Sequence, residues 1–207
     1  MSALAFYIKV VKALEDLKAP YMIVGAFAGL AFGITRATFD VDILVDLRSE
    51  DFDALAARFP PPRYYADPEM MRESTRQGIM FNLIDAEEGV KADLVPLTRE
   101  PDYRAAFGRR VRQILGDETG VPFEAWCAQP ADIIVGKLTA WRQGRSPKHP
   151  ADIYSMLVFS FSGLGDYQVE IPIVTTEAAR LGSETLRLWQ ELVARAEQEV
   201  SKSKGTD

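Results

Sequence analysis

The chain has 207 residues, of which 47% are hydrophobic and 26% are charged. This composition is typical of globular proteins with one substantial core or two small ones, and it excludes a disordered tail protein and a fibrous repeat. Lysine and arginine number 24 against 30 aspartates and glutamates, which gives a formal charge of −6. The chain as a whole is therefore not attracted to nucleic acid or anionic lipid, and binding to nucleic acid would require a local basic patch.

Residue types that support disulfides and zinc sites are nearly absent. The chain has one cysteine, Cys127, and one histidine, His149, so it can form neither an internal disulfide nor a Cys/His zinc site. We interpret Cys127 as a buried small hydrophobic side chain and His149 as a loop residue. This cysteine usage fits a reducing cytoplasm.

Neither export nor membrane insertion is predicted. Four charged residues interrupt the apolar N-terminal residues before the core of a signal peptide could form (Lys9, Lys12, Glu15 and Lys18). The uncharged stretch Ala19–Thr35 is shorter than the roughly 20 residues that a bilayer requires. We therefore expect a cytoplasmic protein with no membrane partner.

Helices and strands alternate over the first hundred residues. Apolar residues at intervals of three and four predict helices, and alternating apolar residues predict strands. In chain order we expect a helix over 4–17, a strand over 21–24, a helix from Gly25 to about Gly33, a strand over 39–46, a helix over 49–59 capped by Ser49, a helix over 68–77, and an antiparallel hairpin of strands 79–84 and 91–97.

The remainder of the chain reads as mostly helical. We expect strands over 111–115 and 121–126, a helix over 130–143, a basic loop over 144–150, a helix over 151–159, one or two helices over 176–200, and a disordered tail over 201–207. The predicted organisation is a first domain over 1–127 and a helical subdomain over 128–200 that completes a cleft.

Asp40 and Asp42 lie on the strand predicted over 39–46, where they alternate with Val41 and Ile43. A strand places both carboxylates on one face, roughly 7 Å apart, within reach of a shared pair of metal ions. Asp51 and Asp53 form the same Asp-x-Asp spacing on a predicted helix, where side chains two residues apart diverge. The strand context, rather than the spacing, therefore carries the signal.

Asp93 lies in another strand pattern and would add a third carboxylate if the two strands were neighbours. Three carboxylates facing one point repel one another unless cations lie between them. Such a set indicates Mg²⁺ or Mn²⁺, and two ions could activate an attacking hydroxyl and stabilise a leaving pyrophosphate. The alternative is three exposed aspartates at strand ends.

Gly25 stands where a strand runs into a helix. The free backbone N–H groups at such a helix start form an anion site that could hold a triphosphate. The alternative is close helix packing through the small residues of this segment.

Four motifs stand in order along residues 21–157. They are Gly25-Ala26-Phe27-Ala28 with Gly33, Arg36-x-Thr38-x-Asp40-x-Asp42, Lys91-x-Asp93, and the helix Ala131–Leu138 followed by Asp152-Ile153-Tyr154. Together they resemble the nucleotidyltransferase superfamily of the DNA polymerase β type, and the similarity is greatest to the bacterial AbiEii and MenT-like nucleotidyltransferase toxins.

The resemblance implies an α/β fold of the α+β kind, with a mixed sheet flanked by helices. It implies that Asp40, Asp42 and Asp93 bind two Mg²⁺ or Mn²⁺ ions, and that Asp93 helps to deprotonate the acceptor hydroxyl. Lys137 matches a lysine that contacts nucleotide phosphates, and Asp152 matches a further aspartate of the site. By the same resemblance, Gly25, Ala26, Arg36 and Thr38 are placed near the nucleotide or its loop.

Two departures from the family pattern concern nucleotide binding and the toxin role. Many members have Gly-Gly or Gly-Ser where this chain has Gly25-Ala26, so a side-chain hydroxyl that would contact the triphosphate is missing. The toxins are also typically longer, and they carry an arginine soon after the Gly-Ser that this chain lacks.

The resemblance leads to two hypotheses. The first is an enzyme that transfers a nucleoside monophosphate from an NTP to a hydroxyl of RNA, of a tRNA end or of a protein, as a toxin-antitoxin or phage-defence component with a cognate antitoxin. The second is a non-catalytic nucleotidyltransferase-like binding or regulatory module. Two basic clusters could bind an RNA backbone, or their side chains could simply be solvated. The first cluster consists of Arg142, Arg145, Lys148 and His149, and the second consists of Arg104, Arg109, Arg110 and Arg112.

Overall fold

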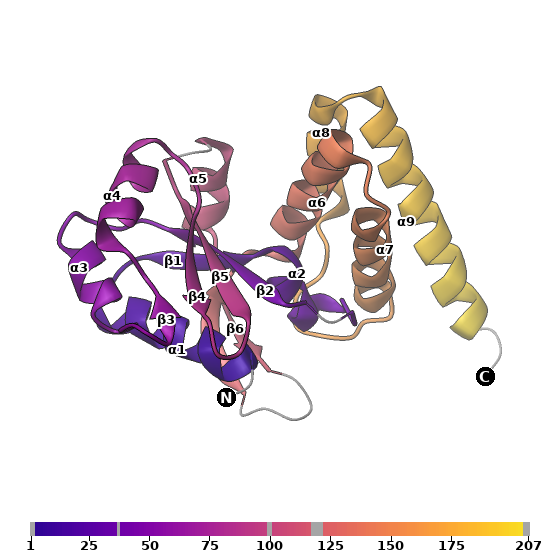
Figure 1. Cartoon of the computed structure of the whole chain (residues 1–207). Coiled ribbons are helices and arrows are strands. Elements are labelled where there is room, and N and C mark those ends of the chain that lie inside the picture. Colours follow the sequence, from indigo (N-terminus) through magenta and orange to yellow (C-terminus); the bar gives the residue numbers. More distant parts are fainter. Residues whose placement is uncertain (1–2, 37, 99–100, 117–121, 205–207) are drawn as a thin grey trace. The chain divides into compact units, whose positions relative to one another are not determined.

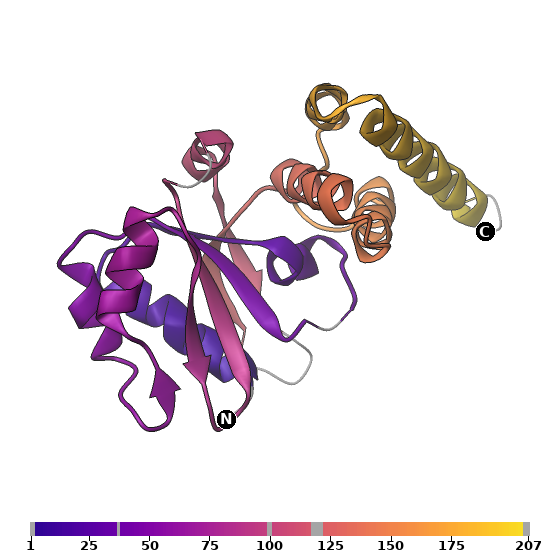
Figure 2. The ribbon, with the colours of Figure 1, turned by 45° about the horizontal axis from the view of Figure 1, so that its top comes forward.

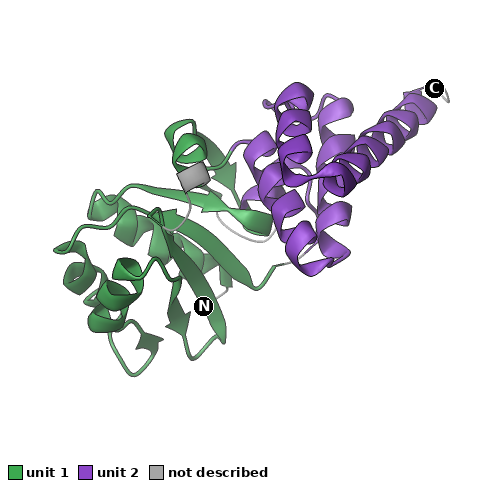
Figure 3. Ribbon diagram, turned by 90° about the horizontal axis from the view of Figure 1, so that it is seen from above, with its two compact units in different colours: residues 1–27, 37–128 green, residues 28–36, 129–207 purple. Residues whose placement is uncertain are grey.

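The computed structural model describes residues 3–36, 38–98, 101–116 and 122–204. The chain forms two compact units, which Figure 3 colours separately. The first unit comprises residues 1–27 and 37–128, and the second comprises residues 28–36 and 129–207. A short stretch of the second unit is thus inserted into the sequence of the first.

Within the described residues, the first unit is built on a mixed sheet of seven strands (Figures 1 and 2). In order across the sheet these are β3 (Tyr64–Tyr65), β4 (Phe81–Asp85), β5 (Val90–Pro96), β2 (Asp40–Val45), β1 (Tyr21–Val24), β7 (Phe123–Cys127) and β6 (Val111–Leu115). β2 is parallel to β5 and β1 is parallel to β7, whereas the other neighbouring pairs are antiparallel. The predicted mixed sheet flanked by helices is confirmed.

The first half of the central strand β2 has one apolar and one acidic side. Val41, Ile43 and Val45 are buried, and each such side chain contributes roughly 1.5–3 kcal/mol when it leaves water. Asp40 and Asp42 alternate with them and are only partly buried. Burial of the valine and isoleucine face therefore fixes the direction in which both carboxylates point.

Within the described residues, the first unit contains further helices, of which α1 and α4 pack on strands of the sheet. They are α1 (Ala3–Asp16), α3 (Asp51–Ala56), α4 (Pro68–Arg76) and α5 (Pro101–Gly108). The helix predicted over 4–17 is confirmed as α1, which buries the stripe that includes Phe6, Tyr7, Val10 and Leu14. Figures 1 and 2 show α1 lying along the sheet, where it packs beside β5.

The second unit consists mainly of helices. They are α6 (Pro130–Gly144), α7 (Lys148–Phe161), α8 (Ile171–Leu181) and α9 (Ser183–Lys204). α7 packs against α6 and α9, and α8 packs against α6 and α9. The short 3-10 helix η1 (Leu30–Phe32) also packs on α7, which is how residues 28–36 belong to this unit.

The helix predicted from Gly25 to Gly33 is interrupted. The structure has a five-residue helix, α2 (Gly25–Gly29), followed by η1. Gly33 ends η1 at φ +96°, and a Cβ there would lie 2.4 Å from the Cβ of Phe159. Both the left-handed backbone and the close contact with α7 require glycine at this position.

The helix predicted over 49–59 is shorter than expected, and Ser49 is not its cap. α3 begins at Asp51, and its N-cap residue, Glu50, makes no side-chain cap bond. Instead, the carboxylate of Asp51 accepts a hydrogen bond from the backbone N–H of Arg48 at 2.8 Å. The turn that precedes the helix is therefore closed by the first helical residue and not by a cap residue. The helix ends at Ala56, before the prolines over 60–62.

Two predictions about the C-terminal half are corrected. The basic loop over 144–150 is partly helical because α7 begins at Lys148, and Pro150 is tolerated in a first turn whose N–H groups need no helical partner. Residues 201–204, predicted as disordered, continue α9, whereas 205–207 lie outside the described residues. The short elements β3 and α5 were not predicted, and Val121, expected to open a strand, also lies outside the described residues.

None of the helices in the described ranges combines the length and the apolar character needed to cross a membrane.

Candidate active site

Acidic side chains from two neighbouring parallel strands form a carboxylate face on the sheet of the first unit. Asp40 and Asp42 lie on β2, and the β2–β5 register places Asp40 beside Lys91 and Asp42 beside Asp93. Residues in register on adjacent strands project to the same side of a sheet. The structure therefore brings Asp40, Asp42 and Asp93 onto one face, and it adds Lys91.

Gly25 fits closely against Asp42. In the β1–β2 register Val24 lies opposite Asp42, and the next residue, Gly25, turns the chain at φ +70°. A Cβ at Gly25 would lie 2.4 Å from Oδ2 of Asp42, closer than non-bonded atoms approach. Glycine is thus required both for the backbone conformation and to admit the Asp42 carboxylate.

Both oxygens of Asp93 are occupied by donors from this unit. The ammonium of Lys91 donates to Oδ2 at 2.5 Å, and the amide of Asn82 on β4 donates to Oδ1. The Asp93 side chain is 7% exposed, whereas that of Lys91 is 43% exposed. The hydrogen bond to Asp93, together with the charges of Asp93, Asp40 and Asp42, raises the pKa of Lys91, so the lysine stays cationic at neutral pH.

Asp40 is held at the entrance to β2. The hydroxyl of Thr38 donates to Oδ1 of Asp40 at 2.7 Å. Thr38 therefore orients the Asp40 carboxylate.

The donor chemistry of the carboxylate face suits a hard divalent cation. Asp40 and Asp42 supply carboxylate oxygens, which Mg²⁺ and Mn²⁺ prefer, and Gly25 leaves room for Asp42. Among the described residues, however, no group of three His, Cys, Asp or Glu side chains is arranged to hold a metal ion. The third carboxylate, Asp93, is bound by Lys91 and Asn82 instead.

A buried phenol lies in the same unit. Tyr7 on α1 is 1% exposed, its hydroxyl has no hydrogen-bond partner, and its ring meets that of Phe27 edge-on at 5.1 Å between centroids. Burial, together with the negative charges of Asp40 and Asp93, raises the pKa of Tyr7 to about 12. The phenol is therefore neutral and adds no charge near the carboxylates.

A second set of predicted residues meets within the second unit. Asp152 on α7 accepts the Nε and Nη2 groups of Arg36 at 2.7 and 2.8 Å and the ammonium of Lys137 on α6 at 2.6 Å. Burial raises the pKa of Asp152, but the hydrogen bonds from Arg36 and Lys137 outweigh burial and lower it. One carboxylate is thus shared by two cations.

The ammonium of Lys137 is buried and paired with a carboxylate. Its side chain is 6% exposed and its ammonium is bound to Asp152. Nearby His149 is in the first turn of α7 rather than in a loop, and its Nδ1 is buried without a partner. Burial and the charges of Lys137 and Lys148 lower the pKa of His149, so it is neutral at physiological pH.

The two basic clusters are largely tied to their own units. Arg142 donates to the carbonyl of Leu181, and Arg145 pairs with Glu184. In the other cluster, Arg112 pairs with Glu15 and Glu124. These ion pairs favour the interpretation as solvated, internally balanced arginines over that of an RNA-binding patch.

Cys127 matches its interpretation as a buried hydrophobic side chain. It is 0% exposed at the end of β7, and burial raises the pKa of its thiol to about 12. The thiol is therefore protonated and unreactive at neutral pH.

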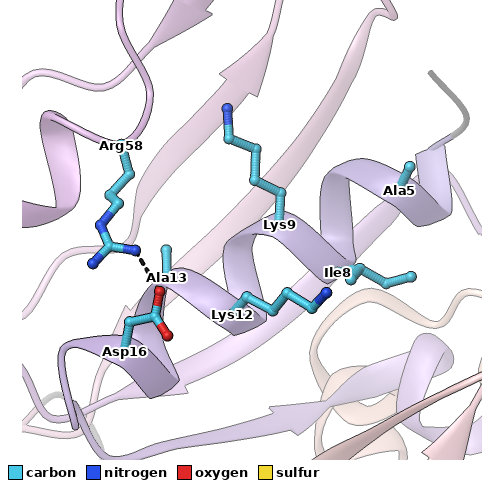
Figure 4. A pocket seen from close by; sticks show the side chains of 7 residues that line it. All are labelled: Ala5, Ile8, Lys9, Lys12, Ala13, Asp16 and Arg58. Atoms are coloured by element: carbon cyan, nitrogen blue, oxygen red, sulfur yellow. Dashed lines mark hydrogen bonds and ion pairs between the residues drawn. The ribbon is translucent and has the colours of Figure 1, made fainter.

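A shallow pocket of about 350 Å³ lies elsewhere on the first unit, along α1 (Figure 4). Lys9, Lys12 and Arg58 line it, and the guanidinium of Arg58 bonds to Asp16 at 2.5 Å. Lys9 lies over the Tyr64 ring at 3.8 Å from its centroid. None of the predicted site residues lines this pocket.

Asn82 was missed from sequence, and so was the role of Lys91. Asn82 stands opposite Asp93 in the antiparallel β4–β5 register. For Asn82, an amide on a neighbouring strand is a usable signal only when the register of the two strands is known, whereas Lys91 lies two residues from Asp93 on the same strand, a spacing that is visible in the sequence.

No protein-family model matches the chain, and no curated protein matches it. Among solved structures, the chain is similar to JHP933 from Helicobacter pylori, with 13% identity, coverage of 99% of this chain and 95% of that one, and a TM-score of 0.49. It is also similar to an antigenic nucleotidyltransferase-like protein from Paracoccidioides brasiliensis, with 16% identity, 90% coverage of each chain and a TM-score of 0.48. A further similar structure is ANT(2")-Ia in complex with adenylyl-2"-tobramycin, with 17% identity, coverage of 92% and 97%, and a TM-score of 0.45.

Proposed function

We propose that the protein is a metal-dependent nucleotidyltransferase that transfers a nucleoside monophosphate from an NTP to a hydroxyl acceptor. The observation that carries this proposal is the carboxylate face: Asp40 and Asp42 on β2, Asp93 in register on β5, and Gly25 fitted against Asp42. Three carboxylates on one partly buried face are costly for stability. Their retention is explained by the binding of cations and of a polyphosphate.

The reaction is an in-line displacement at phosphorus. The acceptor oxygen forms a bond to the α-phosphorus, the bond to the α–β bridging oxygen breaks, and pyrophosphate leaves with that electron pair. Asp40 and Asp42, with Asp93 as the third ligand, would hold two Mg²⁺ or Mn²⁺ ions, which when bound activate the hydroxyl and neutralise charge on the leaving group.

We assign Asp93 to receive the proton of the acceptor hydroxyl. Thr38 orients Asp40 through its 2.7 Å hydrogen bond. Asn82 occupies one acceptor site of Oδ1 and Lys91 one acceptor site of Oδ2, and each carboxylate oxygen has a second lone pair that can take the proton. Lys91 is the more exposed of the two donors.

The remaining residues are assigned to the nucleotide. Backbone N–H groups at Gly25 and Ala26 are proposed to contact the triphosphate, and Lys137 one of its phosphates. Asp152 would hold Lys137 and Arg36 in place through the contacts described above. Arg36, held in this way, is proposed to position the loop before Asp40 or a phosphate.

The resemblance to AbiEii and MenT-like proteins extends this proposal to a biological setting. It favours a bacterial toxin-antitoxin or phage-defence enzyme of the cytoplasm with a cognate antitoxin, and an acceptor hydroxyl on RNA, on a tRNA end or on a protein. Co-purification with the product of a neighbouring gene would test the antitoxin.

The direct test is label transfer from each α-³²P NTP, with Mg²⁺ or Mn²⁺, to total RNA and to proteins including the enzyme itself. Wild type should transfer label, and Asp40→Asn should lose it. Asp46→Asn is the matched control, because Asp46 is an exposed aspartate that directly follows the same strand, and it should retain activity. If no NTP gives transfer while NTPs still raise the melting temperature, the result contradicts catalysis and supports the non-catalytic binding module.

A further inference from the structure

The carboxylate face contains its own cation. Lys91 lies in register with Asp40, and its ammonium contacts Oδ2 of Asp93 at 2.5 Å. Asp40, Asp42, Asp93 and Lys91 together carry a formal charge of −2. The ammonium therefore occupies the third carboxylate at an oxygen that a metal ion would otherwise bind.

The two donors on Asp93 differ in what they can do. Asn82 has a short, neutral side chain on the adjacent strand β4, and it fixes Oδ1. Lys91 has a long, flexible side chain that is 43% exposed, so water can solvate its ammonium when it leaves, and the cost of leaving falls on the buried Asp93 unless another cation takes its place. The carboxylate can therefore change partner at Oδ2 and keep its orientation through Oδ1.

We infer that Lys91 is a positioning residue that acts as a replaceable counter-ion: it neutralises Asp93 in the metal-free protein and competes with a divalent cation for that carboxylate. This inference rests on the proposed function, because it takes the divalent cation from there. It adds that the protein sets its own metal affinity through one lysine.

The size of the effect follows from the charge that is removed. An opposite charge within about 4–6 Å changes the affinity of a carboxylate for a proton by about one to three pKa units. The ammonium of Lys91 should lower the affinity of the same carboxylate for a metal ion in the same way, because it repels the metal cation and occupies the oxygen. Removal of the ammonium should therefore tighten binding of a divalent cation by at least about tenfold.

The experiment counts free Mn²⁺ by electron paramagnetic resonance as the whole chain is titrated, and so it does not depend on activity. Lys91→Met should bind Mn²⁺ at least about tenfold more tightly than wild type, and Lys91→Arg, which keeps the cation, should bind like wild type. Lys12→Met is the matched control for net charge, because Lys12 is an exposed lysine of the same unit. It should also bind like wild type.

A second readout checks the apo protein. Without the Lys91 ammonium the carboxylates of the face repel one another, so Lys91→Met should melt at a lower temperature than wild type in EDTA. Addition of Mn²⁺ should raise the melting temperature of Lys91→Met by more than that of wild type. Circular dichroism of Lys91→Met should show the wild-type helix content, since methionine replaces a half-exposed side chain.

The inference is overturned if Lys91→Met binds Mn²⁺ no more tightly than wild type, including the case in which neither binds. It is equally overturned if Lys91→Arg or Lys12→Met shows the same gain. Tight binding by Lys91→Met that Asp42→Asn abolishes, combined with no label transfer from any NTP, would support the counter-ion and contradict the proposed enzyme. The two failures are therefore distinguishable.

Discussion

Replacement of Asp152 by asparagine should strongly destabilise the second unit. Asp152 is 3% exposed and accepts three hydrogen bonds, two from Arg36 and one from Lys137. Asparagine offers one oxygen and places an NH₂ group against a cation. The ammonium of Lys137, with its side chain 6% exposed, would lose the carboxylate that neutralises it, which costs about 3–5 kcal/mol at buried sites.

Arg36 contributes less to this cost. Its side chain is 39% exposed, so water can solvate the guanidinium, and its pairing is worth at most about 1 kcal/mol. The cost should therefore be largely relieved when Lys137 is also replaced. We expect Lys137→Met/Asp152→Asn to be less destabilised than the sum of the single variants by about 2 kcal/mol or more.

The assay is hydrogen exchange of the α6 and α7 amides under native conditions, because two units need not unfold in one step. Asp166→Asn, at an exposed position of the same unit, should change stability by less than about 0.5 kcal/mol. A loss below about 1 kcal/mol for Asp152→Asn, or strict additivity in the double variant, would refute the argument that Lys137 carries the cost.

The same contacts predict a pH dependence. Because the folded pKa of Asp152 lies below its ordinary value, its contribution to stability is present above the unfolded pKa of about 3.9 and is lost as the pH falls through the folded value. The stability difference between wild type and Asp152→Asn should thus be constant near neutral pH and shrink below about pH 4. A difference that grows on acidification would contradict this sign.

Three further predictions concern single positions. Gly25→Ala should cost at least about 1 kcal/mol, because its Cβ would meet Oδ2 of Asp42 and φ is +70°; unchanged urea unfolding of the first unit would contradict this. Cys127, whose thiol pKa is raised to about 12 by burial, should not react with a thiol reagent in the native protein at pH 8 but should react in urea; a fast native reaction would show that the thiol is accessible. Asp67→Ala should lower stability by about 1 kcal/mol because Asp67 caps α4, whereas Ser49→Ala should be neutral; equal effects in chemical denaturation would contradict the assignment of these caps.

Local patterns were sufficient to predict the elements that carry the first carboxylates. Alternation of Val41 and Ile43 with Asp40 and Asp42 identified β2 and its acidic face, because period two is a property of the strand itself. The hairpin of β4 and β5 was also predicted from its strands and turn. These features depend on residues close in sequence.

Non-local features could not be predicted in the same way. Asn82 meets Asp93 only through the register of β4 and β5, which no local pattern fixes, whereas Lys91 lies two residues from Asp93 on the same strand and shares its face by period two. Arg36 and Asp152 are separated by 116 positions, and nothing beside either residue indicates its partner. The wrong prediction of a cap at Ser49 has a different cause, because Asp51 competes for the same turn and its carboxylate binds the Arg48 N–H.

The path of the chain also bears on how such a protein can be divided. The helical unit takes up residues 28–36, which pack on α7 through η1 and Gly33. A gene cut at codon 128 would separate α7 from that segment and leave the surface around Phe159 uncovered. Recombination at a single crossover therefore cannot exchange one unit for another, and the two units are expected to be inherited together as one piece.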